Sequence, residues 1–145
     1  MKKIDSSDYT SVHIIQPYNT RLIIATPSSK EEITHMEEKW GTRNEDGHLA
    51  GIYDIKHEEW NAVLVIFNMI HKQSVTYGMI AHESIHILDA VFSKIGHEYN
   101  YDNNEPGAYL MEWIYTTILK HFKERNLDSK LTVETEIKPN WKEDI

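Results

Sequence analysis

The amino-acid sequence predicts a single α+β domain, with short strands in the first half and two long helices in the second. In the first half, runs of β-branched and apolar residues alternate with turn-like polar residues, which is typical of strands. In the second half, two longer segments carry helix start and stop signals. A chain of 145 residues with 40% hydrophobic residues can bury one core. Because no repeat or linker divides it, we expect one domain over residues 1–145.

The first half is expected to hold four strands and one helix. The strands are predicted at residues 11–17, 21–26, 50–55 and 62–69. Residues 62–69 (AVLVIFNM) are almost continuously apolar, so this strand is expected to be interior or covered on both faces. A charged helix is predicted over 30–40, with Ser29 as N-cap, Glu32 completing a capping box and Gly41 at the stop.

The second half is expected to be helical. The first helix is predicted over 75–95, between a Ser74 cap and Gly96. The second is predicted over 105–125, because Glu105-Pro106 places proline at the first turn. A last strand is predicted at 131–137. The expected fold is therefore a small mixed or antiparallel sheet of about four to five strands packed on two helices.

Charge and composition exclude several classes of function. With 23 acidic and 15 basic residues the formal charge is −8, which disfavours a nucleic-acid partner. There is no cysteine, so any metal site must use His, Asp or Glu. The start lacks a signal peptide and no stretch resembles a membrane span. We expect a soluble, cytoplasmic protein without a membrane partner; the sequence does not specify its oligomeric state.

The residues AHESIH at 81–86 place His82 and His86 four positions apart, with Glu83 directly after the first histidine. Side chains at i and i+4 share one helical face, so both imidazoles can reach one Zn²⁺ at about 2.0–2.1 Å. A carboxylate after the first histidine can take a proton from a water activated by the metal. The spacing therefore indicates a zinc site with a general base.

The helix that carries this motif is apolar over most of its surface, so we expect it to be buried. Its two histidines, with Glu83 and Asp89, would then need a partner, because burying them alone is costly. A divalent metal would meet that need. Hydrogen bonding among the histidines and the glutamate inside the core is the structural alternative.

A third protein ligand is needed for a zinc site. The chain offers six candidates on or between the two helices: Asp89, His97, Glu98, Asp102, Glu105 and Glu112. Asp89 is better placed to brace an imidazole, whereas an antiparallel helix pair would bring Glu105 beside the histidines. The other histidines lack ligand spacing and the tryptophans are expected to be packing anchors: His13, His35, His48, His57, His71 and His121, with Trp40, Trp60, Trp113 and Trp141.

These features resemble the gluzincin family of zinc metallopeptidases, in which HExxH is followed by a glutamate ligand on the next helix. Here Asn104-Glu105 comes nineteen residues after His86. The resemblance covers roughly residues 62–115. It implies a zincin-like fold, with Zn²⁺ held by His82, His86 and Glu105 and with Glu83 as the catalytic base. The compact outline is also similar to small HExxH proteins encoded by phages or mobile elements.

The resemblance implies hydrolysis of a peptide or protein substrate by a minimal, single-domain metallopeptidase. In zincins an edge strand beside the cleft usually pairs with the extended substrate, and residues 62–69 are the nearest candidate. Tyr109 stands where the family pattern usually has an aspartate that orients the first histidine. The alternative function is a catalytically inactive zincin-like protein that binds metal and acts as a binding or structural module.

Overall fold

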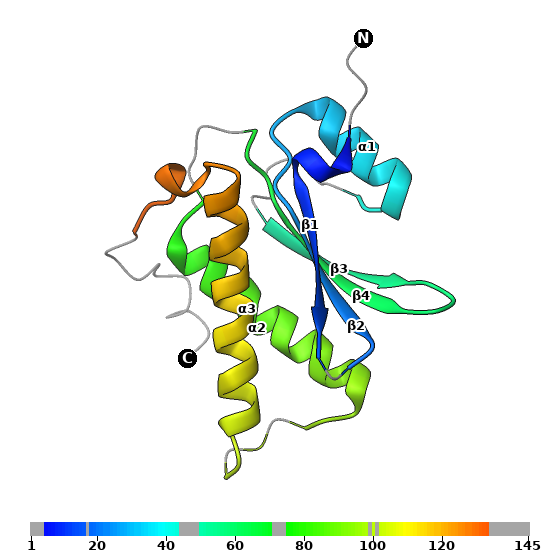
Figure 1. Ribbon diagram of the computed structural model, residues 1–145, viewed down its shortest axis with the longest axis vertical. Coiled ribbons are helices and arrows are strands. Elements are labelled where there is room, and N and C mark those ends of the chain that lie inside the picture. The colour runs from blue at the N-terminus through cyan, green and yellow to red at the C-terminus, as the bar shows by residue number, and fades with distance from the viewer. Residues whose placement is uncertain are drawn as a thin grey trace, which may run out of the picture.

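The computed structural model describes residues 5–16, 18–43, 50–70, 75–98, 100 and 102–133. Over these residues the fold is α+β, with one four-stranded mixed sheet and three α-helices (Figure 1). The elements are β1 (Thr10–Ile15), β2 (Thr20–Ala25), α1 (Lys30–Trp40), β3 (Ala50–Lys56), β4 (Asn61–Phe67), α2 (Tyr77–Ile95) and α3 (Glu105–Glu124), with short 3-10 turns at Ser6–Asp8 and Asp128–Lys130. The predicted α+β class is confirmed.

The sheet has the strand order β1-β2-β4-β3. Strands β2 and β4 are parallel, and the two outer pairs are antiparallel. Strand β4 is therefore interior, as its apolar run predicts. The expectation that it forms the edge beside a substrate cleft is wrong, because β2 and β3 occupy both of its hydrogen-bonding edges.

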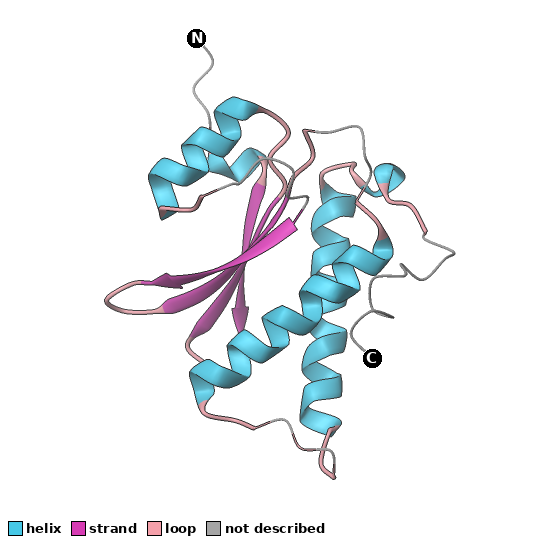
Figure 2. Ribbon diagram, turned by 180° about the vertical axis from the view of Figure 1, so that it is seen from behind, coloured by secondary structure: helices cyan, strands magenta, loops and turns pink. Residues whose placement is uncertain are grey.

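Strand β4 contributes to a core on each face of the sheet, which explains its unbroken apolar sequence. Val63, Val65 and Phe67 belong to the core beneath α2 and α3. Ala62, Leu64 and Ile66 belong to a second core that includes Met36 of α1. Figure 2 shows α2 and α3 crossing on one side of the sheet, away from α1. The alternation follows from the two-residue period of a strand.

Helix α1 has the ends that its sequence predicts. The Ser29 side chain accepts a hydrogen bond from the Glu32 amide at 3.1 Å. In return, the Glu32 carboxylate accepts from the amide of Ser28, one residue before the expected partner, at 2.7 Å. Gly41 closes the helix in the left-handed conformation, with φ 67°, and its amide donates to the Glu37 carbonyl. The predicted bounds of this helix, 30–40, are confirmed: Ser29 marks its start and Gly41 its end.

We expect Ser29→Ala to lower the free energy of unfolding by about 1 kcal/mol, because an N-terminal amide of α1 loses its acceptor. Urea unfolding followed by circular dichroism measures the change. Ser93→Ala is the matched control, since Ser93 is exposed within α2. Equal effects of the two substitutions would contradict the capping role.

Helix α2 begins two residues later than predicted. Its N-cap is Thr76, whose hydroxyl accepts from the Met79 amide at 3.0 Å, and Gly96 ends it as expected. The predicted cap, Ser74, lies outside the described residues. Of the predicted last strand, 131–133 are described: Thr132 forms a parallel bridge with Thr76, and 134–137 lie outside the described residues.

Helix α3 ends one residue before its predicted end, at Glu124. Its first turn carries proline, as expected from Glu105-Pro106. Within the described ranges, no helix is long and apolar enough to cross a membrane.

Candidate metal site on helix α2

The two histidines of the HExxH motif lie side by side on α2. Their Nε2 atoms are 3.2 Å apart, with ring centroids 4.8 Å apart and ring planes at 70°. One helical turn separates the two residues, so both rings leave the helix in nearly the same direction. The structure therefore brings together the predicted pair, His82 and His86.

The expectation that this helix is buried on all sides is wrong. His82, His86 and Asp89 are exposed, and the intervening Ile85 is 53% exposed. The buried residues of α2 lie on one side of the helix: Ile80, Ser84, Ile87, Leu88, Val91 and Phe92. Because the histidine stripe faces solvent, burial does not force a cation on it. The metal hypothesis must rest on the geometry of the pair.

That geometry fits two ligands of one metal ion. In a tetrahedral site with Zn–N bonds of 2.0–2.1 Å, two ligand nitrogens lie about 3.3–3.4 Å apart. The observed Nε2 separation of 3.2 Å is close to this value. A hydrogen bond between two exposed imidazoles would compete with water and contribute little to stability. The separation of the two nitrogens is therefore compatible with two ligands of one metal ion.

Glu83 is half-buried and follows His82 directly, about 100° further round the helix. The side chain of Glu83 therefore leaves the helix next to the histidine stripe and not on it. Asp89 is exposed on the same stripe of α2 as the histidines, about one turn after His86. These two residues flank the pair with one carboxylate each.

The third predicted ligand, Glu105, is the exposed first residue of α3. Among the described residues, no three side chains of the His, Cys, Asp and Glu types form a group that could hold a metal. The structure therefore does not bring Glu105 together with His82 and His86. Helices α2 and α3 cross, and the two ends joined by residues 96–104 stand apart in both views (Figures 1 and 2).

An apolar groove shows how α2 and α3 face each other. Its lining pairs one stretch of each helix: Ile85, Leu88 and Asp89 with Gly107, Ala108 and Met111. Glu112 follows Met111, which lines this groove with Ile85, the neighbour of His86. Glu105 lies six residues before Met111, about 9 Å along the helix axis. The two α3 carboxylates named as candidates flank the α3 side of this groove, with Glu105 two residues before Gly107 and Glu112 one residue after Met111.

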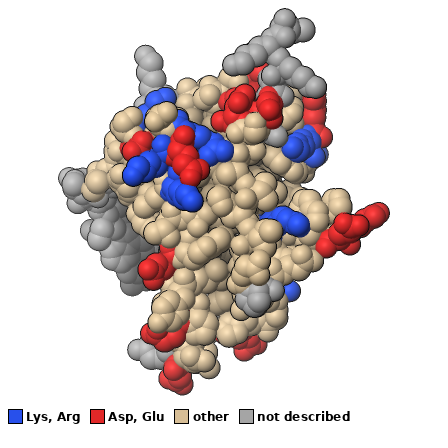
Figure 3. All heavy atoms as spheres, in the orientation of Figure 1, with Lys and Arg blue, Asp and Glu red and all other residues tan. Residues whose placement is uncertain are grey.

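Several acidic residues are exposed on α3 and in the connection that precedes it. Glu105 and Glu112 are both exposed on α3, and Glu98 and Asp102 are exposed in the connection before it. Figure 3 shows acidic side chains without adjacent Lys or Arg at the lower left of the molecule, where the N-terminal half of α3 lies. Lys94 of α2 is paired with Asp54 of β3 at 2.5 Å. A negative potential on this side favours a cation over an anion.

A buried polar network joins β1 to α3, and sequence reasoning missed it. The His121 ring is 1% exposed; its Nδ1 lies 2.6 Å from the Ser11 hydroxyl and its Nε2 lies 2.9 Å from the Thr26 hydroxyl. His13 Nε2 lies 2.8 Å from the same Ser11 oxygen. Burial, reinforced by the charges of Arg125 and His13, lowers the pKa of His121 from 6.5 to about 3. His121 is therefore neutral at physiological pH.

The network has one consistent direction of donation. Thr26 donates to the Tyr9 carbonyl, so its oxygen accepts from His121 Nε2–H. The unprotonated Nδ1 then accepts from the Ser11 hydroxyl, whose oxygen accepts from His13. The signal was present in the sequence, since His121 follows Ile114 and Ile118 on the apolar stripe of α3.

Comparison with protein-family models, with curated proteins and with solved structures finds no match for this chain. The resemblance to gluzincins therefore depends on the HExxH motif and on its spacing to Glu105. Within the structure, the motif's histidine pair has metal-ligand geometry, and Glu105 lies apart from it.

Proposed function

We propose that this protein binds Zn²⁺ through His82 and His86 and hydrolyses peptide bonds as a minimal, zincin-like metallopeptidase. The observation that carries the proposal is the 3.2 Å separation of the two Nε2 atoms, which suits two ligands of one tetrahedral ion. The α+β architecture, with a sheet beside the HExxH helix and a second long helix, is compatible with a zincin-like fold. The substrate would be a peptide or protein.

The bound ion would supply Lewis acidity, lowering the pKa of a coordinated water to about 7 and polarising the substrate carbonyl. Glu83 would accept the proton of the attacking water as its oxygen bonds to the carbonyl carbon. The same carboxylic acid would then protonate the amine as the C–N bond breaks. The half-buried position of Glu83 beside His82 suits a base that must be near the pair and free to exchange protons.

Two carboxylates compete for the role of third ligand. Glu105 has the family spacing, and Glu112 directly follows Met111 of the groove between α2 and α3. Glu105→Gln and Glu112→Gln separate the two, because each keeps the shape of the side chain and removes its charge. We expect only one of them to weaken zinc binding, by at least about 10-fold, equal to about 1.4 kcal/mol. Comparable affinities for both variants and wild type would exclude both residues.

Zinc binding itself is tested by isothermal titration calorimetry together with metal analysis of the purified protein. Wild type is expected to bind one equivalent, and His82→Ala,His86→Ala to bind at least about 100-fold more weakly, equal to about 2.7 kcal/mol. His57→Ala is the control, since it removes an exposed imidazole in the β3–β4 turn, which is not among the candidate ligands. Unchanged zinc content in the double variant would overturn the proposal.

The second candidate function is a non-catalytic module that binds metal and a partner protein. It is favoured by one observation: the pair is exposed and, among the described residues, no third ligand joins it. Such a surface site would bind an ion through two side chains and leave the remaining positions for a partner's ligands. The presence of Glu83 directly after His82 favours the enzyme, because a site that only binds metal needs no general base.

A further inference from the structure

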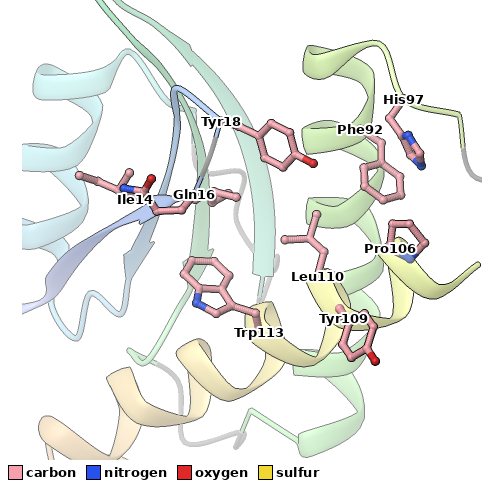
Figure 4. Close-up of a pocket in the computed structure, with 10 residues that line it drawn as sticks. Ile14, Gln16, Tyr18, Phe92, His97, Pro106, Tyr109, Leu110 and Trp113 are labelled. Carbon is pink, nitrogen blue, oxygen red and sulfur yellow. The ribbon is translucent and has the colours of Figure 1, made fainter.

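A second pocket lies on the other side of the α2–α3 pair, between the β1–β2 turn, the end of α2 and the first half of α3. Its volume is about 430 Å³. Figure 4 shows Tyr18 above, Phe92 and His97 to one side, and Trp113 and Gln16 to the other, with Leu110 between them. The pocket contacts α2 at Phe92, about 1.7 turns beyond His86. It is therefore distinct from the histidine pair.

The lining is apolar and aromatic. Four aromatic residues from three separate elements line it: Tyr18 from the turn, Phe92 from α2, and Tyr109 and Trp113 from α3. The His97 ring contacts the Phe92 ring edge-on, with centroids 4.5 Å apart. Among the described residues, no Lys, Arg, Asp or Glu lines this pocket, although such residues make up 26% of the chain. A charged ligand would lose its hydration there without gaining an opposite charge.

A few polar groups border the apolar walls. The Tyr18 hydroxyl points toward Phe92 in Figure 4, and the Gln16 amide and the His97 imidazole also belong to the lining. Each can donate or accept a hydrogen bond. A pocket of this kind, apolar with a small number of polar groups, is the usual form of a small-molecule site. Its walls prefer a flat ring, because aromatic side chains pack on ring faces and edges.

The size of the pocket limits the ligand. An apolar cavity of about 150 Å³ is enough to hold benzene. At about 430 Å³, this pocket accepts one or two fused rings with a small polar substituent. When no apolar molecule fills the pocket, its wall atoms lack the van der Waals contacts that a packed core would make.

We propose that this pocket binds a small, uncharged aromatic molecule of one or two rings. The ring lies among Tyr18, Phe92 and Trp113, and its polar substituent bonds to the Tyr18 hydroxyl or to Gln16. This site requires neither the metal nor Glu83.

Amide chemical shifts in two-dimensional NMR test the proposal, with indole and phenol as probes. Both are expected to give saturable shifts at residues that line the pocket. Indole-3-carboxylate, which has the same ring system and a negative charge, is expected to bind at least about 10-fold more weakly, equal to about 1.4 kcal/mol. Cyclohexanol, which lacks an aromatic ring, is expected to bind more weakly than phenol.

Tyr18→Leu removes one aromatic side chain from the pocket wall. It is expected to weaken indole binding by at least about 5-fold, equal to about 1 kcal/mol. Trp113→Leu removes a second wall in α3 and is expected to do the same. Val12→Ala, at an exposed position outside the pocket lining, is the control. Spectra of the free variants establish that each is folded.

A short tryptophan-containing peptide is titrated as a further probe. Three outcomes would overturn the proposal: shifts that do not saturate, equal affinity for the charged and uncharged probes, or binding of the peptide without binding of indole or phenol. The last would make the pocket a peptide site. Indole binding is also measured in His82→Ala,His86→Ala, where we expect the affinity of wild type. The aromatic site and the zinc proposal can therefore fail separately.

Discussion

Glu83→Gln is expected to slow peptide hydrolysis by about 10²- to 10⁴-fold, the range that a positioned general base contributes. Glutamine keeps the size of the side chain and its hydrogen bonding but cannot accept the proton of the attacking water. Zinc affinity should change little, because the proposed ligands are His82 and His86. Cleavage of a denatured protein substrate by the zinc-loaded variants measures the first effect, and calorimetric zinc titration measures the second.

Glu58→Gln is the control, since it neutralises an exposed carboxylate in the β3–β4 turn, which has no role in the proposed site. It is expected to retain most of the activity. If Glu83→Gln and wild type cleave at the same rate, Glu83 is not the base. If wild type binds zinc but cleaves no denatured protein or peptide library, the protein is the metal-binding module and not the enzyme.

The sequence predicts those elements best whose ends are determined locally. Helix α1 is the clearest example, because Ser29, Glu32 and Gly41 each satisfy backbone groups within four residues in the chain. Strand β4 was correctly placed in the interior, since apolar residues on both of its faces require cover on both sides. The pairing order of the strands depends on contacts distant in sequence, which is why the edge role assigned to β4 was wrong.

The sequence also does not determine which side of α2 faces solvent. Ile85 and the half-buried Met79 made the helix look apolar all round, yet α2 packs through one side only. Amphipathic patterning indicates a buried face, but it does not show whether a stripe of histidines faces solvent or a second layer. The i, i+4 pairing of His82 and His86 did follow from local geometry, and the structure has it. The position of Glu105 depends on how α2 and α3 cross, which a count of nineteen residues does not determine.

The same reasoning explains why His121 was overlooked. Judged by ligand spacing, it is a lone histidine; judged by periodicity, it lies on the buried stripe of α3 with Ile114, Ile118 and Phe122. Its two ring nitrogens are satisfied by Ser11 and Thr26, from parts of the chain about 100 residues away. Such partners emerge only in the folded chain, and they make the protein's stability depend on pH.

Acidification from pH 7.5 to pH 5 is expected to lower the free energy of unfolding by about 2 kcal/mol through His121 alone. The folded state holds the pKa of this residue at about 3, below its ordinary value of 6.5. The unfolded chain therefore binds the additional proton first as the pH falls. Stability from neutral His121 is complete above pH 6.5 and is lost progressively between pH 6.5 and about 3.

His121→Gln removes this titration while keeping one donor and one acceptor for Thr26 and Ser11. Chemical unfolding of wild type and variant, measured at pH 7.5 and at pH 5, gives the loss of stability for each. We expect the loss in the variant to be smaller by about 2 kcal/mol, even if the variant is less stable at both pH values. His57→Gln, at an exposed histidine in the β3–β4 turn, should behave as wild type. Equal losses in all three proteins would mean that His121 accepts its proton without opening the β1–α3 contact. The hydroxyls of Ser11 and Thr26 would then have turned to accept from both ring nitrogens, and the direction of donation deduced for the network would be wrong.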